Sequence, residues 1–183
     1  AVDLKGHTLN SRSEIFAYRA APIQINFLGY PGTMGCDFID YIIADKIIIP
    51  NNEKSYYSEK VIHLPHSYQP NDNQRIISED IISKNKLNLP ENGFVFCCFN
   101  NNYKITPIEF DIWMRILSKV QDSVLWLMET NEFAKQNLMM EAKKRGISSK
   151  RLVFAKNISH SQHLARHQFA DLFLDTFNVN AHT

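Results

Sequence analysis

Residues 94–109 begin with Phe94-Val95-Phe96-Cys97-Cys98-Phe99, an apolar run of the length of a β-strand. A polar loop follows, Asn100-Asn101-Asn102-Tyr103-Lys104, and then the start of a helix. Thr106 is a typical N-cap, Pro107 suits the first helical position, and Glu109 completes a T-x-x-E capping box. The stripe that follows has the period of an amphipathic helix and consists of Ile108, Ile112, Trp113, Ile116, Leu117 and Val120. This stretch therefore predicts a strand, a loop and a capped helix in succession.

The same alternation continues to the end of the chain. Further strands are predicted at Ser123–Met128, Leu152–Ala155 and Leu172–Asp175, with helices at Asn131–Arg145 and Ser161–Ala170 between them. Strands that alternate with helices at these spacings predict a parallel sheet with helices packed on it, a Rossmann-like α/β domain. Ligands bind to such sheets beyond the carboxyl ends of the strands. The loops of interest are therefore 100–106, 129–131, 156–161 and 176–183.

The first part of the chain has a different organisation. Short strand signals occur at Ile23–Leu28, Asp40–Asp45 and Glu59–Leu64, and the Pro- and Asn-containing stretch 67–89 is the expected boundary region. We therefore predict two domains, over residues 1–75 and 76–183. The chain starts without Met inside an apolar stretch and stops just after a predicted strand, which indicates that both ends are cuts.

The composition excludes several classes of protein. Hydrophobic residues make up 44% and charged residues 21% of the chain, as in globular domains. The net charge of +1 gives no basic footprint for nucleic acid, and no apolar run approaches the ~18 residues of a membrane span. The three cysteines, Cys36, Cys97 and Cys98, have neither disulfide-framework nor metal-site spacing. A reducing, cytoplasmic location is the expectation.

The loop that ends in Lys104 suits phosphate oxygens. Lys104 stands near a helix N-terminus, where unpaired N–H groups carry a partial positive charge, and the lysine adds a full one. The alternative interpretation is an ordinary turn with a solvated lysine.

Histidines cluster near another predicted helix start. His160, His163 and His167 occur at i, i+3 and i+7, a pattern open to a metal site, to a polar helix start facing a ligand, or to a solvated face. This helix follows a strand, as Lys104 does, and His182 follows the next strand. Because the carboxyl ends of parallel strands meet at one edge, we predict a nucleotide-diphosphate site there.

In the first part of the chain, glycines follow the first predicted strand as Gly29-x-x-Gly32-x-x-Gly35. Glycines allow close backbone approach to a ligand, but they also simply make turns. The spacing matches neither a Walker A loop nor a dinucleotide fingerprint.

A set of short segments, in order along nearly the whole chain, resembles the catalytic region of the protein O-GlcNAc transferase and SPINDLY family, glycosyltransferase family 41. The segments are Asp3-Leu4-Lys5-Gly6-His7-Thr8, Ala20-Ala21-Pro22-Ile23-Gln24, Leu28-Gly29-Tyr30-Pro31-Gly32-Thr33-Met34-Gly35, Asp40-Tyr41-Ile42-Ile43, Tyr57-Ser58-Glu59-Lys60, Leu64-Pro65-His66, Phe99-Asn100-Asn101-Asn102-Tyr103-Lys104, Ser123-Val124-Leu125-Trp126-Leu127, Leu172-Phe173-Leu174-Asp175-Thr176 and Asn180-Ala181-His182-Thr183. Each segment is short, and the ordered set is specific.

The resemblance implies a two-lobed GT-B fold, with the end of the first lobe over residues 1–75 and an incomplete Rossmann-like second lobe over residues 76–183. It implies transfer of a sugar, GlcNAc from UDP-GlcNAc, to Ser or Thr hydroxyls of proteins, with inversion and without a metal. Lys104 would be the catalytic group that steadies the departing diphosphate, and His163 would approach the uracil or ribose. The other implied donor-binding residues are Asn101, Tyr103, Met128, Ile158, His160, His182 and Thr183 in the second lobe, and Leu28, Gly29, Pro31, His7 and Arg12 in the first.

The chain departs from the animal members of this family at three of these positions. They have Gln at the position of Asn101, Lys at that of His160 and Tyr at that of His7. Two alternatives to a UDP-GlcNAc-dependent transferase therefore stay open: a transferase with GDP-fucose as its donor, and a non-catalytic nucleotide-binding module. The resemblance places the catalytic base and protein-capturing TPR repeats before Ala1, and the rest of the second lobe after Thr183. The expectation is that the 183-residue chain alone is inactive or barely active.

Overall fold

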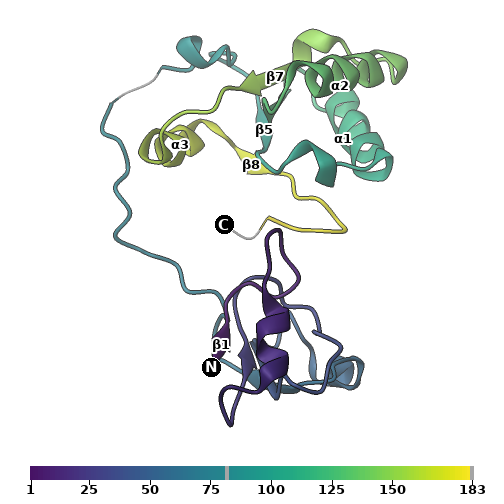
Figure 1. The fold of residues 1–183 in the computed structure, drawn as a ribbon. Coiled ribbons are helices and arrows are strands. Elements are labelled where there is room, and N and C mark those ends of the chain that lie inside the picture. The colour runs from purple at the N-terminus through teal and green to yellow at the C-terminus, as the bar shows by residue number, and fades with distance from the viewer. Residues whose placement is uncertain (81–82, 182–183) are drawn as a thin grey trace. The chain divides into compact units, whose positions relative to one another are not determined.

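The computed structural model describes residues 1–80 and 83–181 and has an α/β fold with two parallel sheets. The chain divides into two compact units, Ala1–Asn73 and Gln74–Thr183, which we call the first and second units. Figure 1 traces the elements of each unit along the chain. None of the helices in the described ranges is both long and apolar enough to span a bilayer.

The first unit contains a small sheet of four parallel strands. The order is β1-β2-β3-β4, with β1 at Val2–Asp3, β2 at Ile25–Asn26, β3 at Tyr41–Ala44 and β4 at Lys60–His63. Strands β3 and β4 confirm two predicted strands. The strand predicted at Ile23–Leu28 is much shorter, because Leu28 turns into the left-handed region with φ of 81°. The unit also has 3-10 helices at Ser13–Tyr18 and Asn51–Tyr56.

The second unit contains a sheet of four parallel strands in the order β7-β6-β5-β8. Their bounds are Val95–Cys98 for β5, Val124–Met128 for β6, Leu152–Ala155 for β7 and Leu172–Phe173 for β8. All four confirm predicted strands, although β8 ends two residues early. The chain runs outward from β5 to β7 and then crosses back to place β8 on the other side of β5. The carboxyl ends of β5 and β8 are therefore neighbours.

Three α-helices connect these strands. Helix α1, Pro107–Lys119, starts with the predicted capping box between Thr106 and Glu109. Helix α2, Glu132–Lys144, is capped by the Asn131 side chain and followed by Gly146 with φ of 76°. Helix α3, His160–Arg166, is shorter than the predicted Ser161–Ala170, because the chain tightens into a 3-10 turn at His167–Phe169. Further 3-10 turns lie at Asn85–Leu87, Asn102–Lys104 and Ser149–Arg151.

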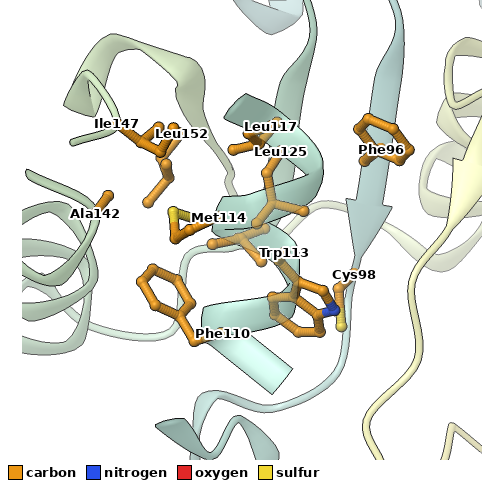
Figure 2. Close-up of a cluster of buried hydrophobic side chains, with 11 residues drawn as sticks. Phe96, Cys98, Phe110, Trp113, Met114, Leu117, Leu125, Ala142, Ile147 and Leu152 are labelled. Carbon is orange, nitrogen blue, oxygen red and sulfur yellow. The ribbon is translucent and has the colours of Figure 1, made fainter. Parts of the chain in front are cut away.

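The sheet of the second unit separates two hydrophobic clusters. On one face, side chains of α1 pack against β5, β6 and the end of α2, as Figure 2 shows. On the other face, Trp126 of β6 packs with Val95 and Cys97 of β5 and with Leu89. Within the predicted stripe of α1, Trp113 and Leu117 are buried, but Ile108 is 67% exposed. Phe110 and Met114 are buried as well, because they share one helical face with Trp113 and Leu117 at the spacing i, i+3, i+4 and i+7.

Candidate functional site

Lys104 lies in the loop between β5 and α1, at the end of the turn Asn102–Lys104. Its Nζ donates a hydrogen bond to the carbonyl oxygen of Asn180, 3.1 Å away, in the segment that follows β8. Nδ2 of Asn102 donates to Oγ1 of Thr130, 2.7 Å away, in the loop after β6. Loops that follow three neighbouring strands therefore meet at one edge of the sheet, which we call the rim.

A buried network holds the loop after β8 against the rim. Nδ2 of Asn100 donates to Oδ1 of Asp175 at 2.9 Å and to Oγ1 of Thr176 at 2.7 Å. Oδ1 of Asp175 also accepts the backbone N–H groups of Thr176 and Ala181. Burial by itself raises the pKa of Asp175, but these hydrogen bonds outweigh it and hold the pKa below its usual value. The carboxylate therefore stays ionised and shapes the loop around itself.

The capping residue of α1 anchors the same loop. Glu109 is 1% exposed, and one of its carboxylate oxygens serves the capping box. The other oxygen accepts the backbone N–H of Phe177 at 2.9 Å. The start of α1, next to Lys104, and the segment after β8 are thus fixed to one another.

His163 and Arg166 form the second part of the rim. Arg166 is 2% exposed, donates to the carbonyl of Lys156 at 2.7 Å, and lies 4.8 Å from the ring centroid of Phe99. It also contacts Nδ1 of His163. Because a guanidinium only donates, Nδ1 accepts, and neutral His163 carries its proton on Nε2. Burial and the nearby charge of Arg166 lower the pKa of His163 to about 4, so near neutral pH its Nε2–H is a neutral donor.

The other predicted residues of the second unit have varied environments. Met128 lies at the end of β6, its sulfur 3.8 Å from Arg166, and Ile158 lines a cavity with Trp126 and Arg166. Asn101 and Tyr103 are exposed between β5 and α1, and His160 is exposed at the first residue of α3. His182 and Thr183 lie outside the described residues.

The rings of His163, in α3, and His167, just after it, have centroids 4.7 Å apart, but both imidazoles have other partners. Nδ1 of His167 bonds to the carbonyl of His163 at 2.7 Å, and His163 bonds to Arg166. Within residues 1–80 and 83–181, no group of three His, Cys, Asp or Glu residues could hold a metal ion.

In the first unit, the predicted residues gather at the loop that follows β2. Nε2 of His7 lies 3.3 Å from the carbonyl oxygen of Met34, and a Cβ added at Gly29 would lie 2.2 Å from the carbonyl oxygen of Lys5. The segment that carries His7 and the loop that carries Leu28, Gly29 and Pro31 are therefore in contact. Arg12 is exposed, and its guanidinium has no hydrogen bond or ion pair within the part of the chain that the structure describes.

The contacts that hold these loops were not predicted from the sequence. They involve Asn100, Asp175 and Arg166 in the second unit, the bond from Glu109 to the loop after β8, and Glu59 in the first unit. Asn100 directly follows a predicted strand and Asp175 is the last residue of another, and these positions could have indicated them. For Glu59, which is buried beside the loop after β2, no local signal exists.

Comparisons with known proteins show which family the chain resembles along its length. The family model described as glycosyl transferase family 41 matches residues 1–81 and 71–183. A probable UDP-N-acetylglucosamine–peptide N-acetylglucosaminyltransferase, SEC, of Arabidopsis thaliana is 36% identical over 100% of this chain, which covers 19% of that protein. A probable enzyme of the same description, SPINDLY, of Solanum lycopersicum is 33% identical over 96% of this chain and 19% of its own length.

A solved structure also matches the chain. The O-GlcNAc transferase of Thermobaculum terrenum, solved as a mutant, superposes with a TM-score of 0.86 at 27% identity. The match covers 98% of this chain and 34% of that protein, and it confirms the expected α/β fold of GT-B type. The chain thus spans about a fifth of the plant relatives and a third of the solved one. The chain belongs to glycosyl transferase family 41.

Proposed function

We propose that this chain carries the donor-binding part of an inverting glycosyltransferase that moves GlcNAc from UDP-GlcNAc to Ser or Thr hydroxyls of proteins. Membership of family 41 supports the reaction class, and the curated relatives are named as UDP-N-acetylglucosamine–peptide N-acetylglucosaminyltransferases.

The observation that carries the proposal is the hydrogen bond from Lys104 to the carbonyl of Asn180. It joins the exits of β5 and β8, the edge at which α/β sheets bind ligands. In the proposed reaction the acceptor hydroxyl gives its proton to a base, which is expected upstream of Ala1, and its oxygen attacks the anomeric carbon. The bond from that carbon to the diphosphate oxygen breaks on the opposite face. UDP leaves with the electron pair, and the ammonium of Lys104 stabilises the charge that grows on the diphosphate. Lys104 supplies positive charge of the kind that a metal ion provides in other transferases, so the proposal needs no metal.

His163 has a separate role in this proposal. Its neutral Nε2–H is free to donate to a carbonyl of uracil or to a ribose oxygen, while Arg166 holds the ring from behind. Met128 and Ile158 provide apolar surface for the base.

The test is Lys104→Met in the full-length protein, with Lys104→Arg and the exposed Lys119→Met as matched controls. Loss of one aimed donor should lower kcat by about 100-fold or more. Lys104→Arg should retain part of the activity because it keeps the charge, and Lys119→Met should match the wild type, because Lys119 ends α1 at the other end of the strands. A loss for Lys104→Met of less than about tenfold, or about 1.4 kcal/mol, would contradict the catalytic role.

The donor is tested by a panel that includes UDP-GlcNAc and GDP-fucose, read as the mass added to acceptor proteins. The expected product carries N-acetylhexosamine. A deoxyhexose product would assign the donor to GDP-fucose, and no product with any donor would favour a non-catalytic module.

A further inference from the structure

Strand β7 forms one edge of the sheet in the second unit, because β6 is its only neighbouring strand within the described ranges 1–80 and 83–181. The carbonyl oxygen of Ala155 accepts the backbone N–H of Glu129, which follows β6, at 2.9 Å. Successive residues of a strand direct their backbone groups to opposite sides. The N–H and C=O of Phe154 therefore face away from β6, and an edge of this kind can pair with another strand.

A cavity of about 290 Å³ lies along this edge, and we call it the β7 groove. Leu152, Val153 and Phe154 of β7 provide the apolar part of its lining, and Asn88 lines it from the segment before β5. The other residues that line the groove carry charge, namely Glu129, Lys135, Lys150 and Lys156. None of these residues belongs to the predicted donor site.

Positive charge prevails in the β7 groove. Nζ of Lys135 lies 3.2 Å from Oε2 of Glu129, the one carboxylate among the described residues that line the groove. The same Nζ lies 5.6 Å from the ring centroid of Phe154, so this lysine is already engaged. Lys150 and Lys156 are exposed and form no ion pair within the part of the chain that the structure describes. Two positive charges are therefore left without a counter-charge.

Three kinds of partner differ in how well they fit the β7 groove. A second copy of the chain, paired through the same edge, would bring the same lysines and be repelled. Nucleic acid would neutralise the lysines but could not pair with the backbone groups of Phe154. An extended peptide with carboxylates does both, because it adds a strand to the edge and supplies the missing negative charge.

We propose that the β7 groove is a docking site for an extended acidic peptide segment of a partner protein. The segment adds a strand beside β7 and forms hydrogen bonds with the backbone of Phe154. Its carboxylates lie near Lys150 and Lys156. This site is separate from the donor site and does not depend on the proposed function.

The test measures fluorescence anisotropy of a labelled peptide of about ten residues, in which Glu alternates with Val, with the full-length protein. The peptide should bind the wild type. The double variant Lys150→Glu/Lys156→Glu should bind it about tenfold more weakly or worse, because carboxylates then face carboxylates. Lys119→Glu is the matched control, since Lys119 is exposed at the end of α1, and it should bind the peptide as the wild type does.

Two altered peptides separate strand pairing from charge alone. The first has Gln in place of Glu, and the second keeps Glu but is methylated at every backbone nitrogen. Each should bind about tenfold more weakly than the original peptide, because the first lacks the charge and the second cannot pair as a strand. The original peptide should also slow the amide hydrogen exchange of residues 152–156.

Several results would overturn the proposal. Absence of binding by the Glu peptide would leave the lysines as a device that only prevents pairing of strand edges. Equal binding by the double variant would place the peptide elsewhere on the protein. Equal binding of the methylated peptide would reduce the contact to ionic attraction, and single-stranded RNA that binds at these lysines where the peptide does not would assign the groove to another class of partner.

Discussion

In both units a functional loop follows a parallel strand, but different interactions hold that loop in place. In the second unit the strands β5 and β6 lie between two hydrophobic clusters, and apolar packing fixes the directions in which their loops leave. In the first unit β1 and β2 have two residues each, and the buried hydrophobic cluster around β3 consists of Ile42, Ala44 and Ile49. Its loop depends on directed polar contacts from Glu59 and Tyr57. Apolar packing directs the strands that lead to the rim, and hydrogen bonds then hold its loops. In the first unit, hydrogen bonds hold the loop after β2 beside a smaller apolar cluster.

The largest expected effect tests the packing side of this comparison. Trp113 of α1 is 2% exposed and packs in the cluster of Figure 2, so Trp113→Ala should destabilise the second unit by about 3–5 kcal/mol. Hydrogen exchange in β5 and β6 under native conditions measures the loss, with Ile42→Ala as the counterpart in the first unit. A loss below about 1 kcal/mol for Trp113→Ala would mean that the rim does not depend on this cluster.

The same difference explains what could be predicted from the sequence. In the second unit the strand of residues 152–155 and the capping box of α1 match the structure, because their signals are local. Ile108 follows the period of the predicted stripe, but it lies in the first turn of α1 and is 67% exposed. The helix predicted to reach Ala170 ends at Arg166, where the chain turns to enter β8.

Residues that act over long sequence separations could not be predicted. Glu59 bonds to residues 25 and 26 positions away, and Asn100 bonds to residues 75 and 76 positions away. Hydrophobic periodicity reports which face of an element is buried, but not which buried polar group meets which loop. Arg166 is similar, because the ring of Phe99 that covers it comes from the other end of the unit.

A smaller effect tests the polar side of the rim. The pKa of His163 is lowered to about 4 from an ordinary value of 6.5, first by burial and then by the charges of Arg166, His167 and His160. Between those values the unfolded chain binds more protons than the folded one, so the free energy of unfolding should fall as pH drops from 6.5 towards 4. His163→Gln should flatten this dependence.

Urea unfolding of the second unit at about pH 7 and about pH 5 checks this prediction, since the window lies above the range in which the carboxylates with lowered pKa titrate. An equal decrease in the free energy of unfolding between about pH 7 and about pH 5 in wild type and His163→Gln would show that another group is responsible.

The most direct test of the central claim is a titration of the isotope-labelled 21.2 kDa chain with UDP, followed by the backbone amide shifts. If the diphosphate binds at the rim, shifts should be concentrated in residues 100–104, 158–163 and 175–181, with little change in the turn 119–123 at the other end of the strands. Shift changes concentrated in residues 119–123, or unchanged amide shifts at the rim while UDP binds, would contradict the account.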